Sequence, residues 1–234
     1  MKISPDITFL PKQGHSREEY EDAFAIADET WPRRFAVADG ATESAYSRVW
    51  ANMLVKGYVD VGPDADEIAS WMDERRAAWR TFVKAQEQDM PWYSAAKVHE
   101  GAHATLLGCT FEADGFWEAL SIGDCCLFQL RDSELITTWP FTDADAFTNM
   151  PPLLSSQESD KPADVQWMSG SWEAGDRFLL ATDAVASFLL SDGRAKRFAR
   201  PEVNREALIA TARAQGAIRN DDCTLLVLTA EAGS

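Results

Sequence analysis

Five groups of acidic residues stand at the boundaries of apolar, strand-like runs in this sequence. Three of them, Asp39, Asp124 and Asp183, follow strongly apolar sequence and have no basic residue beside them. The other two are the pairs Glu21-Asp22 and Asp221-Asp222, each of which begins a strand-like run. Because strands hold side chains in fixed directions, carboxylates at strand ends can converge on one place. We therefore take these residues as the candidates for chemistry.

Carboxylates that meet in a partly dry site repel one another, so they take up protons or hold cations between them. Mg²⁺ and Mn²⁺ are the natural cations, because they favour oxygen ligands. Gly40 directly follows Asp39 and lacks a side chain, which lets its backbone carbonyl approach an ion as a further ligand. An Asp-Gly step is also a common turn, so this stretch alone leaves both interpretations open.

The composition excludes several classes of function. The chain has 234 residues, with 22 Lys and Arg against 38 Asp and Glu, for a formal net charge of −16. So acidic a surface repels nucleic acid and anionic lipid, and we expect neither as a partner. No apolar run approaches the roughly 20 residues of a membrane span. The N-terminal stretch MKISPDITFLPKQG lacks the apolar core of a signal peptide.

The cysteines point to a reducing compartment. Cys109, Cys125, Cys126 and Cys223 all lie in apolar, strand-like runs, and none forms a C-x-x-C pair. We expect small buried thiols rather than disulfides or a zinc site. The sequence therefore predicts a cytoplasmic protein.

Hydrophobic periodicity predicts the elements that must position the acidic residues. Apolar residues at helical spacing predict helices at 44–58, 64–86, 184–192 and 202–215. Segment 139–164 is rich in Pro, Ser and Asp, and an irregular segment of this length is often functional. Strand-like runs in the centre recur about every ten residues, which indicates an antiparallel meander. The predicted strands are 7–10, 22–28, 34–39, 103–113, 115–123, 125–132, 133–139, 165–169, 177–183 and 223–230.

Central strands flanked by helix pairs favour an α+β layered sandwich over alternating βαβ units. Five short motifs accompany this pattern: REEYEDAF (17–24), FAVADGA (35–41), SIGD (121–124), LLATDAV (179–185) and NDDCT (220–224). In this order the motifs resemble those of the metal-dependent, type 2C serine/threonine protein phosphatases, in their shorter bacterial form. The resemblance covers roughly residues 12–230. It implies a single phosphatase domain over 1–234, a four-layer α/β/β/α sandwich of two antiparallel sheets flanked by helix pairs.

The resemblance implies a binuclear Mg²⁺ or Mn²⁺ centre at one end of the sandwich. Asp39 would bridge the two ions. The Gly40 carbonyl and Glu21 or Asp22 would serve one ion, directly or through water.

Asp183 and Asp221 would hold the other ion. Within the Asp221-Asp222 doublet, Asp221 is the better match to the last ligand, and Asp222 is the alternative. Asp124 matches a ligand of a third, looser metal position. The usual partner of that ligand would fall at Ser187, which favours a weak third ion or none.

The phosphate-binding group implied by the resemblance is Arg17, which stands four residues before Glu21. Two ions would neutralise a phosphomonoester and activate a bridging water for direct attack on phosphorus. No protein nucleophile is then needed, and none of the three histidines stands in a hydrolase-like motif. Ala41 occupies the place where many relatives carry a histidine, and segment 139–164 falls where they carry a flap beside the site.

The sequence and the resemblance together predict an Mg²⁺- or Mn²⁺-dependent phosphatase that acts on phosphoserine and phosphothreonine of a protein substrate. We expect a monomer that takes part in signalling with a partner Ser/Thr kinase. The alternative is a phosphatase-like binding or regulatory module with little turnover, which Ala41 and Ser187 favour. A third interpretation is an unrelated acidic, β-rich interaction protein whose carboxylates are only surface.

Overall fold

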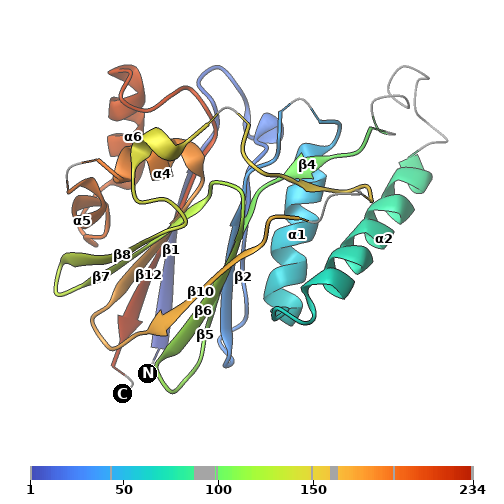
Figure 1. Cartoon of the computed structure of the whole chain (residues 1–234). Coiled ribbons are helices and arrows are strands. Elements are labelled where there is room, and N and C mark those ends of the chain that lie inside the picture. The colour runs from blue at the N-terminus through green and yellow to red at the C-terminus, as the bar shows by residue number, and fades with distance from the viewer. Residues whose placement is uncertain are drawn as a thin grey trace.

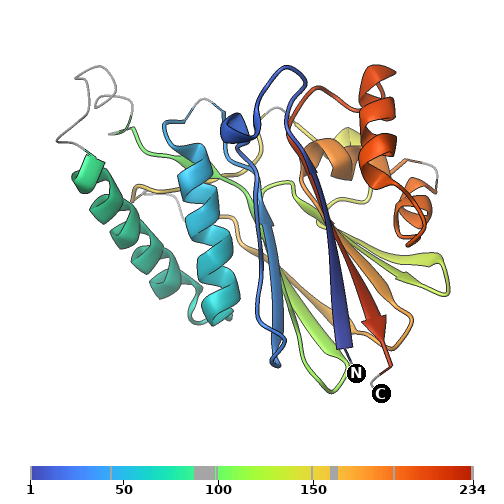
Figure 2. The ribbon, with the colours of Figure 1, turned by 180° about the vertical axis from the view of Figure 1, so that it is seen from behind.

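Two antiparallel sheets pack face to face in the centre of the molecule, and helices cover the outer face of each (Figures 1 and 2). The prediction of an α+β, four-layer sandwich is confirmed. The computed structural model describes residues 2–42, 44–86, 98, 100–148, 150–158, 163–191 and 193–232.

The first sheet has five antiparallel strands and carries both chain termini on neighbouring strands (Figure 1). Its order is β1 (Lys2–Leu10), β12 (Cys223–Glu231), β11 (Arg177–Ala181), β7 (Cys126–Arg131) and β8 (Glu134–Trp139).

The second sheet also has five antiparallel strands. Its order is β10 (Gln166–Ser171), β6 (Phe116–Ile122), β5 (Leu106–Phe111), β3 (Arg33–Ala38) and β2 (Ala23–Ile26). A short third pair joins β4 (His103–Ala104) to β9 (Leu154–Ser155).

Strand β3 illustrates why the central strands are apolar on both faces. Phe35 and Val37 pack into the core between the sheets, while Ala36 and Ala38 face the helices. Side chains alternate along a strand, so a strand buried on both sides needs a continuous apolar run. Such a run ends abruptly where the strand leaves the core, at Asp39.

Helices α1 (Ser47–Val61) and α2 (Ile68–Gln86) cover the second sheet. Trp50 and Trp79 meet edge-on between them, with ring centroids 5.9 Å apart. Helix α1 lies directly on the sheet at Gly108, where a Cβ atom would come within 2.4 Å of the Tyr58 ring. This close contact fixes the distance between the α1 layer and the second sheet.

Among the described residues, three helices cover the first sheet: α4 (Asp183–Leu189), α5 (Arg194–Phe198) and α6 (Arg205–Ala214). The sequence predicted only two helices here and missed α5. That helix spans five residues, too few to display a helical repeat. It is held by tertiary contacts instead, since Phe198 is buried and its carbonyl accepts a hydrogen bond from Arg205 Nε at 2.6 Å.

Two predicted strand boundaries near the acidic residues were also wrong. The predicted strand 177–183 ends at Ala181, because α4 begins at Asp183. The predicted strand 103–113 divides into β4 and β5 at Thr105.

The cysteines agree with the sequence prediction, since all four are buried free thiols. In the part of the chain that the structure describes, no helix combines the length and apolar character needed to cross a bilayer.

Candidate metal centre

Three of the predicted acidic residues line one cavity of about 570 Å³ at the end of the sandwich. Asp39 follows the last residue of β3, Asp183 is the first residue of α4 after β11, and Asp221 precedes β12. The second sheet thus contributes Asp39 from the end of β3, and the neighbouring strands β11 and β12 of the first sheet contribute Asp183 and Asp221. The three side chains therefore reach one cavity, and their role as metal ligands stays a prediction.

Asp39 is fixed by its backbone and perturbed by its neighbours. Its N–H donates to Thr105 Oγ1 at 2.9 Å, and its carbonyl accepts from the Thr105 N–H at 2.9 Å. Burial raises the pKa of Asp39 to about 7, and the carboxylates of Asp221 and Asp124 add to this increase. A buried carboxyl group with acidic neighbours is suited to hold a cation.

Gly40 sits where no side chain fits. A Cβ atom there would lie 2.7 Å from the Glu21 carbonyl oxygen and 2.9 Å from the Ser47 carbonyl carbon. The absence of a side chain lets the segments carrying Asp39, Glu21 and Ser47 approach one another closely.

Asp22 is not one of the residues that line the cavity. It is 3% exposed, and its Oδ2 accepts hydrogen bonds from Thr224 Oγ1 at 2.7 Å and Thr182 Oγ1 at 2.9 Å. Burial, followed by repulsion from Asp39, raises its pKa well above the ordinary range. In the metal-free protein the neutral form of Asp22 is therefore favoured, held by the hydroxyl groups of Thr182 and Thr224.

Asp124 is the clearest indication that the site needs a cation or a proton. It is 1% exposed, and neither carboxyl oxygen has a hydrogen-bond partner among the described residues. Burial raises its pKa to about 6, against a partly opposing effect of Arg219. An unpaired buried carboxylate is costly, so the oxygen-rich donor set of Asp39, Asp124, Asp183 and Asp221 fits a hard divalent ion.

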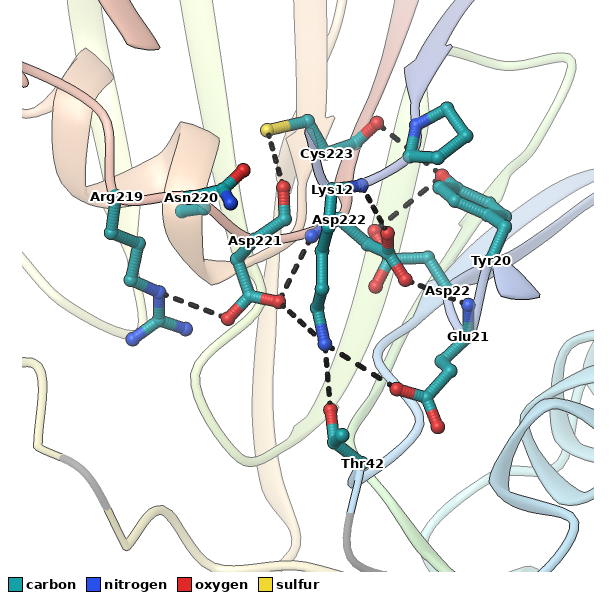
Figure 3. A network of polar contacts seen from close by, with 12 residues as sticks. Lys12, Tyr20, Glu21, Asp22, Thr42, Arg219, Asn220, Asp221, Asp222 and Cys223 are labelled. Atoms are coloured by element: carbon teal, nitrogen blue, oxygen red, sulfur yellow. Dashed lines mark hydrogen bonds and ion pairs between the residues drawn. The ribbon is translucent and has the colours of Figure 1, made fainter. Parts of the chain in front are cut away.

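Two basic residues that the sequence analysis did not single out contact these carboxylates (Figure 3). Lys12 Nζ lies 3.2 Å from Asp221 Oδ1 and 3.4 Å from Glu21 Oε2. Arg219 pairs with Asp183 Oδ2, and its Nε lies 3.3 Å from Asp221 Oδ2. Among the described residues, no three acidic, histidine or cysteine side chains already surround a common point for a metal ion.

The electrostatics of Lys12 follow from these contacts. Burial lowers the pKa of its ammonium group, but the attraction of Asp221, Glu21 and Asp222 outweighs burial and raises that pKa above 10.5. Lys12 is therefore a permanent positive charge at the edge of the acidic cluster.

The Asp221-Asp222 doublet divides between two roles. Asp222 accepts the backbone N–H of Lys12 on Oδ1 and that of Glu21 on Oδ2, each at 2.8 Å. Both oxygens are thus committed to backbone groups, whereas Asp221 lines the cavity. Asp221 is therefore the candidate ligand within the doublet.

Arg17 does not line the cavity. Its guanidinium lies over the Phe9 ring, 5.2 Å from the centroid, and its carbonyl accepts a hydrogen bond from Arg48 at 3.3 Å. Arg219 does line the cavity, with its side chain 46% exposed. The role expected for Arg17 stays a prediction, and Arg219 is a second candidate for it.

His103 lines the cavity and was not singled out by any motif. Its Nδ1 lies 3.2 Å from Ser44 Oγ, its carbonyl accepts the Ala41 N–H at 2.9 Å, and burial lowers the pKa of the imidazole. The bridge between Gly40 and Ala104, together with the hydrogen bonds on either side of it, brings β4 beside the Asp-Gly step. That pairing is tertiary, so the sequence carried no indication of it.

Segment 139–164 contributes to the same cavity. Thr148, Met150, Pro151 and Leu153 form part of its wall, and Met150 is 88% exposed. Residues 149 and 159–162 of the segment lie outside the described residues. The described part supplies the less acidic side of the cavity.

The family model for protein phosphatase 2C matches residues 13–222. Among solved structures, the chain is similar to the Mycobacterium tuberculosis serine/threonine phosphatase PstP/Ppp, with a TM-score of 0.65 and 19% identity over 99% of this chain and 100% of that one. The PstP catalytic domain in complex with two manganese ions matches with a TM-score of 0.63 and 20% identity, over 99% of each chain. RsbX in complex with magnesium matches with a TM-score of 0.58 and 18% identity, over 97% of this chain and 95% of that one.

The comparison with curated proteins found no significant match. Identities of this size show a shared fold, whereas the family model extends over most of the chain. The chain therefore belongs to the protein phosphatase 2C family.

Proposed function

We propose that this protein hydrolyses phosphoserine and phosphothreonine monoesters of a protein substrate in a metal-dependent reaction. The observation that carries the proposal is the buried, unpartnered carboxyl group of Asp124, which lies near enough to raise the pKa of Asp39, beside a cavity lined by Asp39, Asp183 and Asp221. Four carboxyl groups so placed repel one another, and divalent ions relieve that repulsion. Membership of the phosphatase 2C family supports the reaction type.

The proposed centre holds two ions, Mg²⁺ or Mn²⁺. Asp39 would contribute to both positions, and Asp124 would serve a third, weaker ion. When bound, such ions neutralise phosphate charge and increase the acidity of a water that acts as the nucleophile. The ions bound in the similar structures, manganese in PstP and magnesium in RsbX, support this choice of metals. The proposed ligands of the two main ions are Glu21 or Asp22, Asp39, Gly40, Asp183 and Asp221.

The chain itself would supply orientation and phosphate binding. Thr105 forms hydrogen bonds with both the backbone N–H and the backbone carbonyl of Asp39. These two bonds would keep the Asp39 carboxylate directed at the cavity. Arg219 would bind phosphate oxygens once ions occupy its present partners Asp183 and Asp221. Arg17 is the candidate from the sequence pattern, and its position over Phe9 makes Arg219 the better placed of the two.

The remaining features of the proposal concern the setting of the enzyme. We place it in the cytoplasm as a monomeric, single-domain phosphatase in a signalling pathway with a Ser/Thr kinase. Buried free thiols support a reducing compartment. The strongly acidic surface speaks against nucleic acid and membranes as partners.

The alternative function is a phosphatase-like regulatory module with little turnover. Ala41 and Ser187 favour it, because each replaces a residue of the family pattern. The ion pairs that Arg219 makes with Asp183 and Asp221 also favour it, since they engage two of the proposed ligands.

Hydrolysis of phosphothreonine, phosphoserine and phosphotyrosine peptides with Mn²⁺ separates these functions. We expect turnover of the first two peptides, and Asp183→Asn should reduce it at least about 100-fold by removing a ligand. Asp60→Asn, at an exposed position on α1, is the matched control and should leave the rate unchanged. Tight Mn²⁺ binding without hydrolysis of any peptide would favour the regulatory module.

A further inference from the structure

Lys12 places a positive charge between ligands of the two proposed ions. Its ammonium group lies 3.4 Å from Glu21, proposed for one ion, and 3.2 Å from Asp221, proposed for the other. The ammonium group also donates a hydrogen bond to Thr42 Oγ1, with Nζ and Oγ1 2.8 Å apart (Figure 3). This third contact helps to hold Nζ between the two carboxylates. The ammonium group therefore lies where cations are expected to bind.

The backbone holds Lys12 in this place. Asp222 accepts the N–H groups of Lys12 and Glu21 on its two oxygens, which clamps residue 12 beside residue 21. The Lys12 side chain is only 14% exposed. Arg219 differs, because its side chain is 46% exposed and can turn into solvent when an ion arrives.

Glu21 is fully engaged by its own chain. Its Oε1 accepts from Ser47 Oγ at 2.7 Å, and its Oε2 faces Lys12. A divalent ion that binds this carboxylate must therefore displace the ammonium group from it. The unpartnered oxygens of Asp124 present no such competitor.

We propose that Lys12 is a built-in cation of the metal centre, which competes with a divalent ion for Glu21 and so makes the two metal positions unequal. Lys12 also pairs with Asp221, but Asp39 and Asp183 form no ion pair with it, so the position at Asp39, Asp183 and Asp221 keeps two carboxylates free of the ammonium group and fills first. The position that needs Glu21 fills only at higher metal concentration. This inference rests on the proposed metal centre. It predicts a graded dependence of the enzyme on Mg²⁺ or Mn²⁺ concentration.

Titration of the protein with Mn²⁺ tests the inference without any substrate. Calorimetry and electron paramagnetic resonance are recorded on the wild type, on Lys12→Met and on the exposed control Lys56→Met. The wild type should bind one ion tightly and a second at least about tenfold more weakly, with the spin-coupled Mn²⁺ pair appearing only at excess metal. In Lys12→Met the second ion should bind at least about tenfold more tightly, since a unit charge within about 4 Å has been removed.

Thr42→Val provides a second variant that keeps the lysine but removes one of its three partners. It should tighten the second ion in the same direction by a smaller factor, and it carries the test if Lys12→Met does not fold. Unchanged affinity for the second ion in the folded variants would overturn the inference, as would two equally tight ions in the wild type. Peptide hydrolysis is measured separately. If the affinity for the second Mn²⁺ ion changes as expected but no peptide is hydrolysed, the proposed activity is refuted and the role of Lys12 is not.

Discussion

Replacing Asp124 by Asn should stabilise the metal-free protein, although it removes a charged residue from the centre. Asp124 is 1% exposed, and neither carboxyl oxygen has a partner among the described residues. Its ionised form is therefore destabilised by the fold. Asn has nearly the same shape and carries no charge at any pH.

The size of this effect follows from the pKa of Asp124, which burial raises from 3.8 to about 6. A raised carboxyl pKa means that the folded protein loses stability as the pH rises from about 4 through about 6. The full shift corresponds to about 3 kcal/mol at pH 8. For a chain of this length, a gain of about 1–3 kcal/mol in Asp124→Asn raises the melting temperature by about 3–10 °C.

Thermal unfolding in EDTA, followed by circular dichroism at pH 8 and pH 5, measures this gain. We expect it to fall by about half at pH 5, where much of the penalty on the wild type has already been relieved. Asp60→Asn should show no gain at either pH. An Asp124→Asn protein that melts at or below the wild type at pH 8, or with a gain independent of pH, would refute the argument.

Two further predictions concern the packing and the phosphate site. Gly108→Ala should destabilise the protein by about 1–3 kcal/mol in urea unfolding, because the new methyl group would lie 2.4 Å from the Tyr58 ring; an unchanged midpoint would show that α1 can move away from the sheet at no cost. Arg219→Ala should raise KM for phosphopeptides about tenfold or more and keep Mn²⁺ binding, whereas Arg17→Ala should have the smaller effect, because only Arg219 lines the cavity. A larger KM effect of Arg17→Ala in steady-state kinetics would return the phosphate-binding role to Arg17.

The sequence predicted most of the layers because most of the elements bury strongly patterned faces. Strand β1 is an instructive exception, since only 7–10 was predicted while the strand spans Lys2–Leu10. Pro5 and Asp6 weaken the strand pattern in its first half. The strand forms because it lies at the edge of its sheet and pairs along its whole length with β12, which no local pattern reveals.

The site shows a similar division. Asp39, Asp183 and Asp221 could be singled out because the first two end apolar runs and Asp221 lies two residues before one. The contacts of Lys12 and Arg219 could not, because a basic residue in a loop carries no periodicity that indicates its partner. Lys12 reaches Asp221 across most of the chain length, through the pairing of residues near β1 with residues near β12.

The central claim is that the carboxylates in this cavity hold divalent ions for phosphate hydrolysis. Its most direct test is the hydrolysis of p-nitrophenyl phosphate by the wild type and by Asp39→Asn, each with Mn²⁺ and with EDTA. The account predicts turnover by the wild type with Mn²⁺ alone, and its loss in EDTA and in Asp39→Asn. Equal turnover in EDTA, or an Asp39→Asn protein as active as the wild type, would contradict it.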